Sequence, residues 1–244
     1  MNPRAIRTMQ ASLEALGISY TPEQISLLGT YLDMLKAANK TMNLIGEASD
    51  NEVVHKHIID SLMPMAQHPE AVSLMKGHLL DAGAGAGLPG IPLLIMNHGL
   101  RIVLVESRLK KNRFLQDVIQ NLKLENAETI AERLEDIAHD PAFREQFDIV
   151  VARALGNLAL LAELCLPFVA LQGFLVAYKG PHYREEVEES AEVLATLGGA
   201  LEDIREFSLP RTEFNRSLLY IKKVQPTPQK FPRRAGIPQK RPLR

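Results

Sequence analysis

The spacing of apolar and polar positions changes near residue 76. Before it, apolar residues recur every three or four positions, and the Thr–Pro–Glu sequence that begins at Thr21 is typical of a helix start. One buried helix face consists of Ile25, Leu28, Leu32 and Leu35. We therefore expect residues 1–75 to form a helical cap.

From His78 onward, short apolar runs alternate with segments of helical periodicity, such as 108–122 and 157–166. This alternation predicts an α/β domain over residues 76–224 with a mostly parallel, doubly wound sheet. The expected strands cover residues 78–81, 101–105, 127–130, 147–151, 173–178, 201–208 and 217–223. The last two runs are separated by a segment too short for a helix. We therefore expect the seven-stranded sheet to end in an antiparallel hairpin.

Residues 225–244 differ in composition from the rest of the chain. They contain five prolines and six lysines or arginines, and no acidic residue. Proline blocks regular helix and strand, so this tail is expected to be an extended or disordered arm. Its charge indicates a polyanionic partner.

The overall composition narrows the class of protein. With 46% hydrophobic and 23% charged residues, and no apolar run near the roughly 20 residues that span a bilayer, we expect a cytoplasmic protein without a membrane partner, and a monomer. Cys165 is the only cysteine, which excludes an intramolecular disulfide and a thiolate zinc cluster. Its apolar surroundings indicate a core residue, and we expect no bound metal.

The first expected strand is followed by the glycine-rich sequence LLDAGAGAGLPGIPL, in which Asp81 ends the strand and Pro89 lies near the start of a helix. The glycines are Gly83, Gly85, Gly87 and Gly90. Glycine lets the backbone turn tightly and approach a ligand, and a helix start offers free N–H groups. This loop predicts a site for a nucleotide-like ligand.

An acid at the end of the second strand, Glu106, is placed to accept hydrogen bonds from ribose hydroxyls. Both a nicotinamide dinucleotide and S-adenosylmethionine contain such a ribose, so Glu106 does not discriminate between the two cofactors. No tyrosine is followed by a lysine four residues later, as in a short-chain dehydrogenase, and no room remains for a substrate domain. A P-loop is excluded because no Gly-Lys-Ser/Thr follows the glycines. We favour S-adenosylmethionine and keep a nicotinamide oxidoreductase as the first alternative.

Five sequences occur in order along most of the chain, and together they carry a resemblance to a known family. They are NLIGEASDNEVVHKHIIDSL, LLDAGAGAGLPGIPL, VESRLKKNRFL, FDIVVARAL and AYKG. This succession resembles the bacterial glucose-inhibited-division-B family, whose members form 7-methylguanosine in the decoding-region loop of 16S rRNA. The tail also looks like an extension found in Gram-positive-type members. One departure is Ala86, where many members have proline.

The resemblance implies a Rossmann-like S-adenosylmethionine-dependent methyltransferase fold. It implies cofactor contacts from Gly83, Leu88, Leu134, Glu135 and Arg153. The other candidate cofactor contacts, at the ends of the first two strands, are Asp81, Gly85, Gly87, Glu106 and Ser107. The implied partner is 16S rRNA in the small ribosomal subunit or its assembly intermediate, and a non-catalytic assembly factor is the second alternative.

The expected chemistry needs no general base, because guanine N7 has a free lone pair that can attack the methyl group directly. Positioning should then supply most of the rate, and Arg153 is the candidate catalytic residue through positioning. Methylation at cytosine C5 would need a nucleophilic cysteine, and Cys165 is in an apolar segment. Methylation of an exocyclic amine commonly uses an Asn or Asp followed by two prolines after the fourth strand, where this chain has Ala152-Arg153-Ala154.

Candidate RNA contacts come from three regions: the cap, the start of the helix after Glu106, and the basic positions toward the carboxyl end. They are Asn43, His57, Asp60, Arg108, Lys110, Lys111, Arg113, Lys179, Arg184, Arg233 and Arg234. His57 and Asp60 share one helix face. An acidic run with helical spacing is expected to be a solvated face turned away from RNA. It consists of Glu185, Glu186, Glu188, Glu189 and Glu192.

Overall fold

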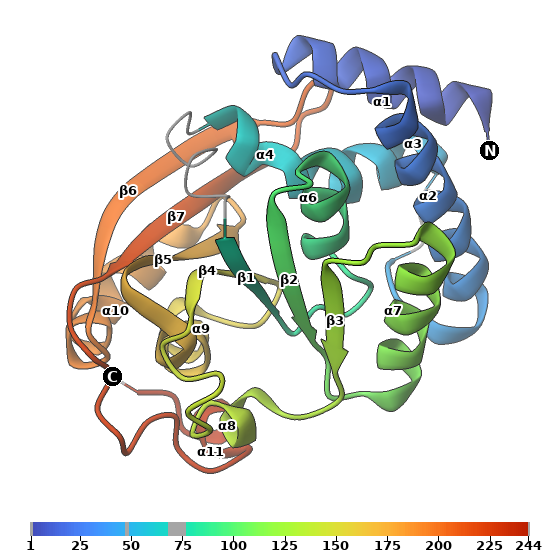
Figure 1. Ribbon diagram of the computed structural model, residues 1–244. Coiled ribbons are helices and arrows are strands. Elements are labelled where there is room, and N and C mark those ends of the chain that lie inside the picture. Colours follow the sequence, from blue (N-terminus) through green and yellow to red (C-terminus); the bar gives the residue numbers. More distant parts are fainter. Residues whose placement is uncertain (1, 47–48, 68–76, 244) are drawn as a thin grey trace.

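The computed structural model describes residues 2–46, 49–67 and 77–243 (Figure 1). The amino-terminal helices are α1 (Pro3–Ala15), α2 (Pro22–Met42), α3 (Asp50–Val53), a π-helical turn (Val54–Ile59) and α4 (Asp60–Gln67). The strands are β1 (Gly77–Ala82), β2 (Leu100–Val105), β3 (Ala127–Ile130), β4 (Phe147–Arg153), β5 (Val169–Lys179), β6 (Gly199–Ser208) and β7 (Asn215–Lys223). The later helices are α6 (Gly90–Met96), α7 (Leu109–Leu122), α8 (Leu134–Ile137), α9 (Leu158–Cys165), α10 (Tyr183–Thr196) and α11 (Ile237–Lys240), with a 3₁₀ turn at Leu166–Phe168.

The strands form one seven-stranded sheet in the order β3-β2-β1-β4-β5-β7-β6. Strands β1 to β5 are parallel, whereas β7 runs antiparallel to both β5 and β6. The predicted α/β fold, its seven strands and its terminal hairpin are confirmed. The chain reverses direction across the sheet between β1 and β4, which is where α/β proteins of this topology bind ligands, beyond the carboxyl ends of the strands.

Side chains alternate between the two faces of the sheet, and each face is covered by helices (Figure 1). Leu79 and Ile149 belong to the apolar cluster that includes α1, α2, α6 and α7. Leu80 and Val150 belong to the cluster that includes α8, α9 and α10. Cys165 lies in the second cluster with 0% exposure, so its predicted burial is confirmed.

The amino-terminal helices pack directly on this domain. Helix α2 begins with a capping box, in which the backbone N–H of Gln24 donates to Oγ1 of Thr21 and the N–H of Thr21 donates to Oε1 of Gln24. The amide of Gln24 also donates to the carbonyls of Ile95 and Met96, at the end of α6. The helix start predicted at Thr21 is thus confirmed, and the same residues fasten α2 to the helix that follows the glycine loop.

The carboxyl-terminal tail differs from the sequence-based expectation. It does not project as a free arm. Residues 225–243 fold back against α8 and α9, and four of them form the short helix α11. Phe231 and Thr227 are buried, at 5% and 3% exposure. As expected, the prolines exclude long regular elements. The tail is nevertheless ordered, because it supplies the partners of two buried charged residues in the domain, Arg144 and Glu163.

Within the ranges that the structure describes, none of the helices is both long and apolar enough to cross a membrane.

Candidate active site

The glycine loop joins β1 to α6 and adopts a backbone that few other residues tolerate. Gly83, Gly85 and Gly87 have φ values of +70°, +58° and +87°, in the left-handed region that favours glycine. The N–H of Ala84 donates to the carbonyl of Val105 at 2.9 Å, which holds the loop against the end of β2. A Cβ at Gly85 would meet only the carbonyl of Gly83, at 3.7 Å. The backbone at Gly85 is therefore open to a ligand.

Asp81 lies beneath the loop, near the end of β1, and is 1% exposed. Its Oδ2 accepts a hydrogen bond from the N–H of Gly90 at 2.8 Å, at the start of α6. Burial raises the pKa of Asp81 to about 7. Its Oδ1 has no hydrogen-bond partner among the described residues, so one acceptor remains for a donor from outside the chain.

Glu106 links the glycine loop to the start of α7. Its Oε2 accepts from the N–H of Gly85 at 3.1 Å, and its Oε1 accepts from the N–H of Arg108 at 2.8 Å. The backbone N–H of Glu106 donates to the carbonyl of Ile130, at the end of β3. A carboxylate oxygen can accept more than one hydrogen bond. The fixed carboxylate, at 8% exposure, therefore keeps capacity for the hydroxyls of a ribose.

Tyr31 of α2 is a site residue that the sequence did not reveal. Its side chain is 0% exposed, and its hydroxyl donates to the carbonyl of Ala86, in the glycine loop, at 2.7 Å. Burial raises the pKa of Tyr31, so the hydroxyl stays protonated as a donor. The only available signal was its place on the apolar face of α2, three residues after Leu28, where it is indistinguishable from a core aromatic.

Tyr31→Phe is expected to lower the free energy of unfolding by about 1–2 kcal/mol, because the Ala86 carbonyl loses its buried donor. For a protein of this size, that corresponds to a fall in Tm of roughly 2–8 °C. Tyr20→Phe is the matched control, since the Tyr20 hydroxyl donates to Glu14 on the surface. Equal Tm values for the two variants, by thermal denaturation, would contradict the role assigned to Tyr31.

Arg153 is the last residue of β4, and its guanidinium makes hydrogen bonds to residues of the amino-terminal helices. Its Nη1 donates to Oδ2 of Asp60 at 3.1 Å and to the carbonyl of Lys56 at 3.2 Å. Its Nη2 lies 3.2 Å from Nδ1 of His57. The structure thus brings together three of the residues singled out from the sequence. Asn43 is at the carboxyl end of α2, exposed and in a left-handed conformation, and is not among the described partners of Arg153.

A second arginine, Arg216, belongs to this group, and no sequence motif had pointed to it. Its Nε lies 3.6 Å from Oδ1 of Asp60, an ion-pair distance without a hydrogen bond. Strand β7 is antiparallel to β5, so the amino end of β7 lies beside the carboxyl ends of β4 and β5. The ring of Phe214 is close to both Arg216 and Lys56, whose charged groups are 5.9 Å and 4.3 Å from the ring centroid.

The titration of the Arg153 group follows from its burial. Burial, together with the positive charges of Arg153, Lys56 and Arg216, lowers the pKa of His57 to about 4. His57 is therefore neutral near pH 7, and Nδ1 can accept from Arg153. Burial raises the pKa of Asp60, and the two arginines oppose that rise.

The free energy of unfolding is expected to fall as the pH drops from about 6.5 to about 4, because unfolded His57 binds a proton at a higher pH than folded His57 does. The contribution is about 1–3 kcal/mol. Urea denaturation between pH 4 and 7 gives the free energy of unfolding of the unchanged protein and of His57→Asn. The difference between the two pH profiles isolates the contribution of His57, because both proteins contain all the other titrating groups. Parallel pH profiles would contradict the burial of a neutral His57.

Several of the residues expected to contact RNA have ion-pair partners within the protein. Lys179 is 7% exposed, and its ammonium donates to the carbonyl of Gly156 and to Glu186, at 2.8 Å and 2.6 Å. Arg233 is paired with buried Glu163. Glu186 was expected on a solvated face, but it is half-buried and also accepts from the N–H of Leu158. Ion pairs between different elements account for these differences: Lys179 of β5 with Glu186 of α10, and Arg233 of the tail with Glu163 of α9.

The remaining candidates keep positions on the surface or around the loop. Arg184 is exposed and paired with Glu206. Arg108, Lys110 and Arg113 are exposed at the start of α7, with Lys111 half-buried beside them, and Arg234 is exposed in the tail. Leu88 is buried in the glycine loop, Ser107 is exposed after β2, and Leu134 and Glu135 begin α8.

Comparisons with known proteins bear on the function of this arrangement. The sequence model of a family described as rRNA small subunit methyltransferase G matches residues 24–215. A curated relative from Pelotomaculum thermopropionicum, named ribosomal RNA small subunit methyltransferase G, is 44% identical over 97% of this chain and 98% of its own. A relative of the same name from Lactobacillus johnsonii is 38% identical over the full length of both chains.

Solved structures show a similar fold at low identity. A branched-chain polyamine synthase variant from Thermus thermophilus, in complex with N4-aminopropylspermidine and 5'-methylthioadenosine, superposes with a TM-score of 0.56 and 12% identity, covering 82% of this chain and 65% of that one. A putative sarcosine dimethylglycine methyltransferase from Galdieria sulphuraria gives 0.51 and 10%, covering 67% and 84%. The curated relatives carry the name of a methyltransferase, so neither the oxidoreductase nor the non-catalytic alternative is retained.

Proposed function

The chain belongs to the rRNA small subunit methyltransferase G family, and we propose that it transfers the methyl group of S-adenosylmethionine to N7 of a guanine in the decoding-region loop of 16S rRNA. One observation carries this proposal. The glycine loop with Glu106 and the Arg153 group lie at the same edge of the sheet, at the carboxyl ends of neighbouring strands β1 and β4. A nucleotide-binding half and a polar, positively charged half therefore adjoin each other.

The residues present fit S-adenosylmethionine. The open backbone at Gly85 suits close contact with the ligand, the Glu106 carboxylate suits ribose hydroxyls, and the free Oδ1 of Asp81 suits a donor or a positive charge. Gly83, Gly87 and Leu88 would complete the loop side. Ser107, Leu134 and Glu135 would border the adenine side, after β2 and β3. When bound, the cofactor supplies an electrophilic methyl group on a sulfonium.

The protein's own contribution is alignment rather than proton transfer. Arg153 uses three hydrogen bonds to Lys56, His57 and Asp60, which leaves two of the five donors of a guanidinium. These two can hold the guanine O6 or the carboxylate of the cofactor, and so fix N7 in line with the methyl group. Cys165 is buried, and burial raises the pKa of its thiol, so a mechanism through a cysteine nucleophile has no support.

The start of α7 is the best-supported RNA contact. Its first turn holds basic and no acidic residues, although positive charge at a helix amino terminus is unfavourable. An anionic partner would relieve this cost. The basic residues there are Arg108, Lys110, Lys111 and Arg113. We expect the protein to act in the cytoplasm, where ribosomal subunits are. The tail carries two further exposed charges, Lys230 and Arg234, near Glu135 and Asp136 of α8.

Lys110→Gln is expected to weaken binding to small ribosomal subunits and to lower the slope of log K against log salt by about 0.7–0.9, the value for one phosphate contact. Lys123→Asn is the matched control. Lys123 ends the same helix in a left-handed conformation that asparagine tolerates. Binding measured between 50 and 200 mM salt checks both variants. An unchanged slope for Lys110→Gln would remove α7 from the interface.

The proposed reaction is tested by methyl transfer from labelled S-adenosylmethionine to small subunits from a strain that lacks this protein, followed by nucleoside analysis of the digested rRNA. Label in 7-methylguanosine is the expected result. Deproteinised 16S rRNA and assembly intermediates, assayed in parallel, identify the form of the substrate. Label in a different nucleoside, or no label with any of the three substrates, would overturn the proposal.

A further inference from the structure

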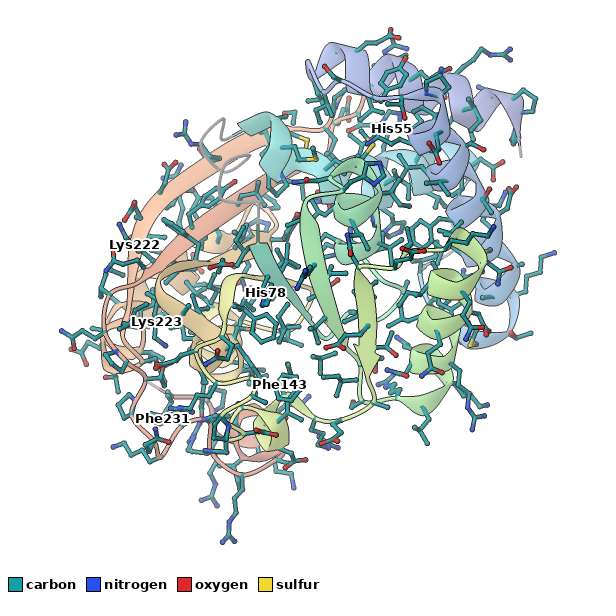
Figure 2. The ribbon with its side chains drawn as sticks, in the orientation of Figure 1. His55, His78, Phe143, Lys222, Lys223 and Phe231 are labelled. Carbon is teal, nitrogen blue, oxygen red and sulfur yellow. The ribbon has the colours of Figure 1, made fainter. Side chains whose placement is uncertain are left out.

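A buried arginine ties the carboxyl-terminal tail to the end of α8. Arg144 is 8% exposed. Its guanidinium donates to the carbonyl of Ala138, immediately after α8, and to the carbonyls of Thr227 and Phe231 in the tail, at 3.0, 2.7 and 3.0 Å. A fourth bond reaches the carbonyl of Pro228 at 3.3 Å. Figure 2 shows Phe231 and Lys223 at the end of the molecule where the tail folds back.

The tail also holds the beginning of α8. The backbone N–H of Gly236 donates to Oε1 of Glu135, in the first turn of the helix, at 2.9 Å. His139, two residues beyond the helix, places Nε2 2.9 Å from the carbonyl of Pro232. Hydrogen bonds from the tail therefore reach α8 at both of its ends, and α11 lies beside it (Figure 1).

A buried ion pair anchors the tail itself. Glu163 of α9 is 0% exposed, and its carboxylate accepts hydrogen bonds from the backbone N–H, Nε and Nη2 of Arg233 at 3.0, 2.8 and 2.6 Å. A buried carboxylate without such a partner would be strongly destabilising. The bidentate geometry fixes the direction of the tail on either side of Arg233.

Helix α8 in turn borders the proposed cofactor site. It has four residues, too few to be stable without tertiary contacts. Leu134 packs in one cluster with Ala82 and Val105, which end the two strands that precede the glycine loop and Glu106. The carbonyl of Ile130, at the end of β3 and shortly before α8, accepts a hydrogen bond from the backbone N–H of Glu106 at 3.0 Å. The position of α8 therefore sets one wall beside the loop and the Glu106 carboxylate.

We propose that the carboxyl-terminal tail is a positioning element for cofactor binding, acting through α8. The positioning residues are Gly236 in the tail and His139 and Arg144, which bond to the tail. None of them needs to touch the cofactor. This inference rests on the proposed use of S-adenosylmethionine. It differs from a role of the tail in RNA binding, because it predicts a defect in cofactor affinity when no RNA is present.

The test uses a variant that ends at Ala235. It loses the Gly236 bond to Glu135 and the bond from Arg233 to the carbonyl of Arg241. It keeps the three bonds from Arg233 to Glu163 and the bonds of Arg144, which anchor the rest of the tail. The matched control is the double variant Lys240→Ser, Arg241→Ser, which removes basic charge and retains Gly236. Binding of S-adenosylhomocysteine without RNA is measured by calorimetry, and kcat and KM are measured with small subunits.

We expect the shortened variant to bind S-adenosylhomocysteine about tenfold more weakly and to raise the KM for S-adenosylmethionine about as much, with kcat unchanged, whereas the charge control binds normally. His139→Ala changes an exposed side chain and leaves the fold intact, and it should weaken binding about two- to threefold. Unchanged affinity in both the shortened variant and His139→Ala would overturn this inference alone. Failure of the intact protein to bind S-adenosylhomocysteine would overturn the proposed function as well.

Discussion

Arg153→Ala is expected to lower kcat/KM for methyl transfer to small ribosomal subunits by a factor of about 10²–10³. The loss of one preorganised donor at the reacting groups of an enzyme has this size, about 2.7–4 kcal/mol of transition-state stabilisation. The loss has two sources here. The two free N–H donors disappear, and Asp60 and His57 lose the guanidinium that holds them at the end of β4.

Arg153→Lys separates charge from geometry. Lysine keeps the positive charge near Asp60. Its single ammonium group cannot reproduce the planar set of hydrogen bonds that Arg153 makes with Asp60, His57 and the carbonyl of Lys56. We therefore expect Arg153→Lys to recover stability to urea but little of the activity. Arg205→Ala is the control, because Arg205 pairs with Asp203 on the exposed strand β6. Single-turnover methylation with labelled cofactor measures the effect, and near-normal rates in both Arg153 variants would remove Arg153 from the active site.

Gly83→Val is expected to weaken binding of S-adenosylmethionine at least about a hundredfold while the protein stays folded. Valine would have to adopt a φ of +70°, and its Cβ would lie 2.8 Å from Cδ1 of Leu155. A β-branched residue at positive φ is strained by about 1–3 kcal/mol, which the loop can relieve only by moving away from the end of β1.

Gly17→Val provides the matched control. Gly17 has a φ of +67°, nearly that of Gly83, and a Cβ there meets nothing within 4 Å. Both variants carry the strain of positive φ, and Gly83→Val adds the close contact with Leu155. Thermal denaturation should show both variants folded, and only Gly83→Val should lose the cofactor. Calorimetric titration with S-adenosylhomocysteine compares them. Equal affinities would mean that the glycine loop does not bind the cofactor.

The sequence by itself determined the strands, the glycine loop and their succession along the chain. Strand burial has a period of two, helix burial has a period near 3.6, and glycine and proline mark the turns, so all seven strands and the hairpin could be predicted from local patterns. The structure moved only boundaries: β4 extends to Arg153, and β5 begins at Val169. Asp81 and Glu106 were placed because a residue at the end of a strand has a known location in a parallel sheet.

Only the tertiary structure decided which charges are buried and what they meet. Lys179 and Arg233 were expected on the surface beside RNA. In the structure, Lys179 of β5 pairs with Glu186 of α10, and Arg233 of the tail pairs with Glu163 of α9. Tyr31 reaches Ala86 across 55 positions of sequence. Local periodicity shows whether a position faces the core. A hydrogen bond between distant segments depends instead on how the layers of the fold pack, and the residues that neighbour each partner in the sequence do not specify that packing.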